Sequence, residues 1–187
     1  MTHKLFLGLT AAAALSLGAC ATMPMGEQTV MVGGAAMYPS RTIVANAVNS
    51  KDHTTLVAAV QAAGLVDTLS GPGPFTVFAP TNDAFAKLPA GTVDTLLKPE
   101  NRATLQTVLT YHVVPGRLSA ADLMSRIRAG NGVANLTTVQ GGTLQARMMG
   151  RGIVLIDAKG GRAMVTQADV FQSNGVIHVT DSVSLPG

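Results

Sequence analysis

The chain has 187 residues, of which 47% are hydrophobic and 12% are charged, and its formal net charge is +3. This apolar content excludes a wholly disordered chain, and the small net charge together with 4% aromatic residues argues against nucleic acid as a partner. The length suits one ordinary domain preceded by a targeting segment.

Residues 1–20 have the pattern of an export signal. After a basic start, an apolar run covers residues 5–17, which is too short to span a bilayer comfortably. The run leads into Leu17-Gly18-Ala19-Cys20, which resembles the lipobox of bacterial lipoproteins. The resemblance implies that Cys20 is lipidated, becomes the first mature residue and anchors the chain to the outer membrane. Ordinary cleavage after Ala21 is the alternative, and it leaves an exported protein in the periplasm or outside the cell.

Residues 21–40 combine methionine, glycine and proline without a lasting periodicity, and we interpret them as a flexible linker. Their four methionines are of the ligand type that binds soft metals, but the linker interpretation is the simpler one. We expect no metal and no cofactor in this chain. The folded domain is then expected over residues 41–187.

The first half of this domain has helical patterns. Apolar residues recur at helical spacing, and Gly64 is placed to end the second helix. A Gly-Pro-Gly-Pro break precedes a short buried strand over residues 75–78, after which Thr81 is placed to cap the next helix. The expected helices cover residues 43–48, 56–63, 83–88, 92–97 and 100–109.

The second half is rich in β-forming residues separated by glycine turns. Because helices come first and strands follow, the pattern predicts an α+β fold rather than alternating α/β. The expected strands cover residues 133–139, 143–148, 153–157, 163–165 and 176–180.

Three segments carry a family resemblance. Thr-Val-Phe-Ala-Pro-Thr-Asn-Asp-Ala-Phe at 76–85 is similar to the first signature block of fasciclin-like (FAS1) domains. Leu-Thr-Tyr-His-Val-Val-Pro-Gly at 109–116 resembles their central Tyr-His segment, and Asn-Gly-Val-Ile-His-Val-Thr-Asp at 174–181 resembles their closing block. The resemblance implies a single domain, a wedge-shaped sandwich of about seven strands with helices packed around it. It also implies a non-enzymatic, extracellular role.

In animal members of this family, two segments have been assigned to integrin binding. They map to Tyr111 and His112 and to Asp169-Val170-Phe171 in this sequence. Bacteria have no integrins, so the resemblance implies a binding region and not a named partner. The alternative for Tyr111 and His112 is that both are buried and bonded to the backbone.

A basic stretch runs from Arg117 to Arg162 and contains seven basic and two acidic residues. We predict that its arginines gather on one face, with Arg147, Arg151 and Arg162 as candidates for binding an anionic polysaccharide. The alternative is a set of solvated arginines scattered over hairpins.

These observations predict a non-enzymatic, envelope-attached or secreted binding module for cell adhesion or for contact with matrix or biofilm. Its expected partner is a surface or matrix protein or an anionic polysaccharide, with membrane contact through the lipid anchor and no nucleic acid. A carrier of a small apolar ligand between helices and sheet is the alternative, and a cavity of about 300 Å³ or more would favour it. An enzyme that uses His112 or His178 as a base is a third hypothesis, although the sequence lacks the common hydrolase, metalloprotease and phosphate-loop motifs.

Overall fold

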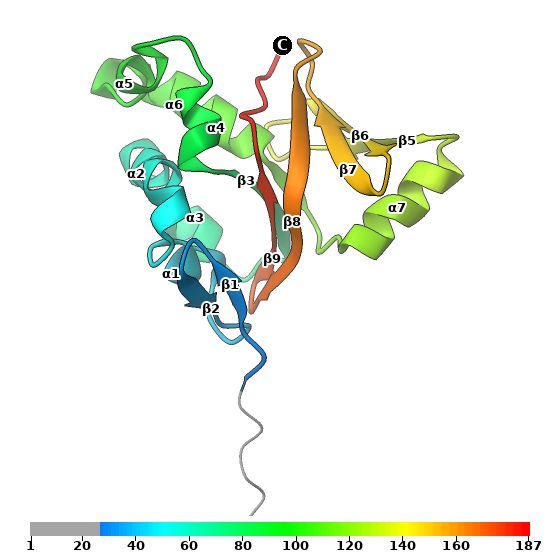
Figure 1. Ribbon diagram of the computed structural model, residues 1–187. Helices are drawn as coiled ribbons and strands as arrows, with labels where there is room; N and C mark the ends of the chain where they lie inside the picture. Colours follow the sequence, from blue (N-terminus) through cyan, green and yellow to red (C-terminus); the bar gives the residue numbers. More distant parts are fainter. Residues whose placement is uncertain (1–26) are drawn as a thin grey trace, which may run out of the picture.

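The computed structural model describes residues 27–187, so the expected export signal and Cys20 lie outside the described residues. Helices fill most of its first half and strands most of its second half, which confirms the α+β class (Figure 1). Within the described residues the helices are α1 (Ile43–Ala47), α2 (Thr54–Ala63), α3 (Val66–Ser70), α4 (Asn82–Ala86), α5 (Thr92–Leu96), α6 (Arg102–Tyr111) and α7 (Ala120–Ala129), with short 3-10 turns η1 (Lys51–His53) and η2 (Pro99–Asn101). The strands are β1 (Val30–Val32), β2 (Ala35–Met37), β3 (Phe75–Pro80), β4 (Val113–Pro115), β5 (Val133–Thr137), β6 (Thr143–Met149), β7 (Gly152–Ile156), β8 (Arg162–Gln172) and β9 (Gly175–Thr180). None of the described helices is long and apolar enough to cross a membrane.

Local sequence signals fix several helix ends. Thr42 and Thr81 cap α1 and α4, because each side-chain oxygen accepts the backbone N–H of the residue three positions later. A capping box formed by Ser119 and Asp122 starts α7. Gly64 ends α2 at φ +70°, a conformation that costs glycine less than other residues. Each helix expected from the sequence is present, and α3 and α7 are additional.

Seven strands form one sheet in the order β4-β3-β9-β8-β7-β6-β5. The β3–β9 pair is parallel, and the other neighbouring pairs are antiparallel. The two edge strands approach each other, because the N–H of Val139, just after β5, donates to the Val113 oxygen of β4 at 2.7 Å. The sheet therefore nearly closes on itself, and the expected sheet of about seven strands with helices around it is confirmed.

The core consists of two clusters that share strand β3. Alternation along this strand sends Val77 towards helices α1 to α6 and Phe78 into the interior of the curved sheet. The helix-side cluster includes Leu56, Val77, Ala79, Phe85, Leu109, Ile177 and Val179, and the inner cluster includes Phe78, Leu123, Ile127, Leu136, Leu144 and Leu155. Figure 1 shows α7 on the opposite side of the sheet from α1 and α2, so each cluster has its own helical cover.

The structure differs from the expected flexible linker over residues 27–40. Strands β1 and β2 pair as a hairpin, joined by Gly33 and Gly34, which both have positive φ as this two-residue turn requires. Val32 and Met37 are buried in the helix-side cluster. The linker interpretation is therefore wrong for residues 27–40, because apolar side chains there complete the core.

Candidate functional site

The Tyr-His segment joins the end of α6 to β4. The Tyr111 side chain is 1% exposed, its hydroxyl donates to the Thr143 oxygen at 2.7 Å, and the same hydroxyl accepts the N–H of Ala158 at 3.1 Å. The phenol therefore ties β6 to the turn after β7. Burial raises the pKa of Tyr111.

His112 is buried beside it and uses both ring nitrogens. Nδ1–H donates to the Val108 oxygen at 2.8 Å, and Nε2 accepts the N–H of Ser184 at 2.9 Å, a pattern that assigns the neutral tautomer. Burial lowers the pKa of His112, which keeps the ring neutral. Neither Tyr111 nor His112 offers a surface to a partner, because the aromatic rings fill the core. The structure therefore agrees with the alternative stated for Tyr111 and His112, in which both side chains are buried and bonded to the backbone.

The second candidate segment, Asp169-Val170-Phe171, lies on an irregular part of β8. Asp169 has φ +60°, and its carboxylate accepts the N–H of Ala120 at 2.7 Å, at the start of α7. Val170 is 1% exposed, so it cannot contact a partner. Phe171 is 39% exposed and is the one side chain of this segment that presents a large apolar surface.

The described histidines do not form a catalytic arrangement. His178 is fully buried, and His53 bonds the Ser50 hydroxyl through Nδ1 at 2.9 Å while both residues are buried. None of the histidines at 53, 112 and 178 is hydrogen-bonded to a carboxylate side chain. Residues 27–187 also contain no group of three or more His, Cys, Asp or Glu side chains that could hold a metal.

Comparison with known proteins decides the family. A family model described as the fasciclin domain matches residues 51–186. The chain belongs to the fasciclin family. "Protein sll1483" from Synechocystis is 45% identical over 190 residues, which cover 99% of this chain and 98% of that protein. "Immunogenic protein MPB70" from Mycobacterium bovis is 37% identical over 143 residues, which cover 74% of this chain and 65% of that protein.

A solved structure supports the same fold. The FAS1 domain pair from the insect cell adhesion molecule Fasciclin I aligns with a TM-score of 0.68 and 19% identity, covering 78% of this chain and 51% of that chain. At this identity the likeness concerns the fold alone. The family resemblance seen in the sequence is therefore confirmed.

The strand register of this fasciclin domain places Arg147 and Arg162 on one face. Arg147 pairs with Val154, Val154 pairs with Met164, and Arg162 lies two residues before Met164 on β8. Residues that pair across neighbouring strands share a face of the sheet, and so do residues two positions apart on one strand. Arg147 and Arg162 therefore both project from the side opposite the inner cluster. We call this exposed side of β6, β7 and β8 the outer face.

Four other arginines of the basic stretch do not join the outer face. Arg126 and Arg128 belong to α7, whose buried residues pack in the inner cluster on the other side of the sheet. Arg151 lies in the two-residue turn between β6 and β7. Arg117 donates to the Gln172 and Ser173 oxygens at 2.9 and 3.1 Å. The prediction that the arginines of the basic stretch gather on one face is therefore wrong as stated. Arg147 and Arg162 share the outer face, whereas α7 carries Arg126 and Arg128 on the inner side of the sheet.

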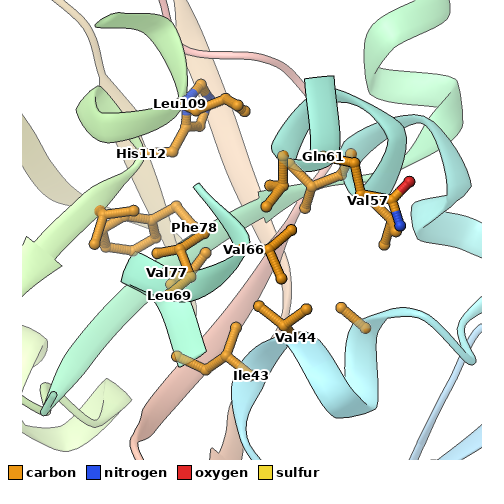
Figure 2. Close-up of a pocket in the computed structure, with 14 residues that line it drawn as sticks. Ile43, Val44, Val57, Gln61, Val66, Leu69, Val77, Phe78, Leu109 and His112 are labelled. Carbon is orange, nitrogen blue, oxygen red and sulfur yellow. The ribbon is translucent and has the colours of Figure 1, made fainter. Parts of the chain in front are cut away.

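A small apolar pocket lies between the helices and strand β3 (Figure 2). Val44, Val57 and Val66 from α1, α2 and α3 face Val77 of β3, with His112 at one end. A second cavity beside it is also lined by apolar residues and His53. The fasciclin domain thus has apolar space where the carrier hypothesis places it.

The size of these cavities argues against a carrier. Their volumes are about 40 and 30 Å³, whereas ligand pockets usually have about 300 to 1,000 Å³. A groove of about 460 Å³ runs between α5, α6 and the C-terminal segment, but it is open to solvent and lined partly by threonines.

Proposed function

We propose that this fasciclin domain is a non-enzymatic binding module of the adhesion type, which contacts an anionic polysaccharide through its outer face. Family membership supports the general role, because the structural relative is a domain pair of a cell adhesion molecule. The buried histidines and the small cavities leave surface contact as the function that the geometry favours.

The observation that carries the proposal is the shared position of Arg147 and Arg162. Both side chains are exposed, and neither has a salt bridge, since the one such pair within residues 27–187 joins Lys87 to Asp181. Val154 lies between Arg147 and Met164 and is only 5% exposed, whereas Arg147 is exposed and its guanidinium donates to the Gln145 side chain at 3.4 Å. Two cations without a salt-bridge partner on the same face of a sheet suit a linear polyanion.

Binding to immobilised dextran sulfate, with neutral dextran as the control polymer, tests the proposal. Arg147→Gln/Arg162→Gln removes both charges and keeps part of each aliphatic stem over the strands. We expect this variant to lose most of the binding, and we expect wild-type binding to weaken as salt shortens the screening length from about 10 Å at 0.1 M to about 3 Å at 1 M. Equal binding by the variant and the wild type at low salt would refute the role of the outer face. The exposed Phe171 would then be the better candidate for a protein partner.

We also propose that the domain is exported and held at the outer membrane through lipidated Cys20. The lipobox-like residues before Cys20 support this, and the fold accommodates it, because the first described residues precede the β1–β2 hairpin at the edge of the molecule (Figure 1). Intact mass of protein made in a bacterial host should show acyl additions, and Cys20→Ser should release the protein from membranes. A soluble wild-type protein that begins at Thr22 would show simple cleavage instead.

A further inference from the structure

The lobe made by α7, β5, β6 and β7 has a one-sided charge. Between Leu123 and Ile156 the sequence contains four arginines and no acidic residue. The preceding acidic residue, Asp122, lies at the start of α7, where its carboxylate bonds the backbone and hydroxyl of Ser119. Arg126 lies one helical turn after Asp122 and interacts with its carboxylate, whereas Arg128, Arg147 and Arg151 have no acidic neighbour in this stretch of the sequence.

The fold brings three of these arginines to one end of the lobe. Arg126 and Arg128 lie in the last turn of α7, and the chain then turns tightly at residues 130–132 to enter β5. Val133, the first residue of β5, pairs with Arg147 of β6. The β6–β7 turn that contains Arg151 follows Arg147 by three residues. The C-terminal end of α7 and the β6–β7 turn thus lie at the same end of the strands.

Two exposed methionines occupy the same end. Met148 is 39% exposed and Met149 is 51% exposed, and as neighbours on a strand they point to opposite sides of β6. Met148 shares its side with Ile153 of the inner cluster, next to α7. The end of the lobe is therefore apolar at the turn and basic around it.

We propose that this end, which we call the basic tip (Arg126, Arg128, Met148, Met149 and Arg151), docks on an anionic lipid bilayer. Flexible apolar side chains that enter the acyl boundary, flanked by arginines at the level of the headgroups, form the pattern of an interfacial membrane contact. A polysaccharide offers no apolar phase for the methionines, so their exposure favours a lipid surface. The basic tip shares no residue with the outer-face pair Arg147 and Arg162, so the two proposals stand or fall separately.

Sedimentation with vesicles tests the basic tip. The two described core clusters and the described strands lie within residues 27–187, so a chain that starts at Ala21 contains the whole described fold and lacks the leader and Cys20. It should bind vesicles of phosphatidylcholine and phosphatidylglycerol in equal parts, and bind pure phosphatidylcholine far less. Arg128→Gln/Arg151→Gln should weaken vesicle binding by about tenfold or more, because each arginine at an anionic surface contributes roughly a factor of five. Met148→Ser/Met149→Ser should also weaken it, although no charge changes.

The matched control is Lys159→Gln/Arg162→Gln, which removes two charges near the opposite end of β7. It should keep vesicle binding and weaken dextran sulfate binding, because Arg162 is removed and Arg147 remains, whereas the basic-tip variants should weaken vesicle binding and keep dextran sulfate binding. The inference is overturned if wild type binds both kinds of vesicle equally. It is also overturned if the control loses as much vesicle binding as the tip variants, or if the methionine variant binds like wild type. Any of these results leaves the dextran sulfate test unaffected.

Discussion

The imidazole of His178 stacks on the ring of Phe78 across the parallel β3–β9 pair, with ring centroids 5.6 Å apart and planes inclined by 26°. Its Nε2–H donates to the Leu118 oxygen at 2.7 Å, and its Nδ1 accepts the N–H of Asp169 at 3.3 Å. The neutral ring therefore pairs one backbone carbonyl, that of Leu118, and one backbone N–H, that of Asp169, in a fully buried site. Protonation of Nδ1 would convert this acceptor into a donor, which would then face the N–H of Asp169.

The first prediction concerns acid. Burial lowers the pKa of His53, His112 and His178 in the folded state, below the ordinary value of 6.5. Below that value the unfolded chain binds protons that the folded chain does not, so the free energy of unfolding falls with falling pH by up to about 1.4 kcal/mol per pH unit for each histidine. The contribution of these three histidines to stability is therefore fully present above pH 6.5 and falls below it. Urea unfolding at about pH 7.5 and about pH 5.5 measures the loss.

His53→Leu provides the internal check on this prediction. The Nε2 of His53 has no hydrogen-bond partner and the ring lines an apolar cavity, so leucine suits that side of the ring. The substitution also removes the bond to the buried Ser50 hydroxyl, a loss that applies at both pH values and leaves the pH dependence as the quantity to compare. Removing one of the three histidines with lowered pKa values should reduce the pH dependence of unfolding. The carboxyls of Asp122 and Asp181 do not account for this window, because their lowered pKa values act below the ordinary 3.8. Equal unfolding free energies at both pH values would contradict the assignment of buried neutral histidines.

The second prediction concerns Asn174, which connects three segments from the β8–β9 turn. Its Oδ1 accepts the N–H of Ile43 at 2.9 Å, and its Nδ2 donates to the Leu69 and Gly71 oxygens at 2.8 and 2.9 Å. Asn174→Ala leaves these backbone groups unpaired in a buried site and should cost at least about 2 kcal/mol of stability. The exposed Asn49, changed to Ala, should cost about 0.5 kcal/mol or less. Similar unfolding midpoints for both variants would show that water replaces these bonds.

Much of the fold could be predicted because its signals are local. The caps at Thr81 and Gly64 and the alternation along β3 depend on nearby residues, and the expected elements there are present. Two missed elements also had local signals. Gly33-Gly34 between short apolar runs is a hairpin turn, and Ser119 followed by Asp122 is a capping box before Leu123.

The candidate site was harder to predict, since it depends on contacts between distant segments. The burial of Tyr111 follows from its bonds to Thr143 and Ala158, more than thirty residues away. The shared face of Arg147 and Arg162 requires the register of three strands, which spacing alone does not give. By contrast, the placement of His178 on the opposite side of β9 from Ile177 and Val179 requires nothing beyond the alternation of a single strand.

The third prediction concerns the N-terminal hairpin. Met37 is 2% exposed in the helix-side cluster, so Met37→Ala should destabilise the domain by about 2 kcal/mol or more. Met31, on the same hairpin, is 58% exposed, and Met31→Ala should change stability by about 0.5 kcal/mol or less. A chain that starts at Arg41 should melt below one that starts at Ala21. If both chains melt together, the hairpin contributes nothing to the stability of the core.

The last prediction concerns Phe85, the aromatic residue of α4. It is 7% exposed and packs in the helix-side cluster with Leu105 and Val179, so truncation leaves a cavity that the surrounding helices cannot fill. Phe85→Ala should cost about 3 kcal/mol or more, which for a domain of this size lowers the melting temperature by roughly 6 to 12 °C. Phe171 is 39% exposed, and Phe171→Ala is the matched control because it removes the same atoms from the surface. Thermal unfolding followed by circular dichroism compares the two. If Phe85→Ala melts within about 1 °C of wild type, α4 is not held to the sheet by this ring.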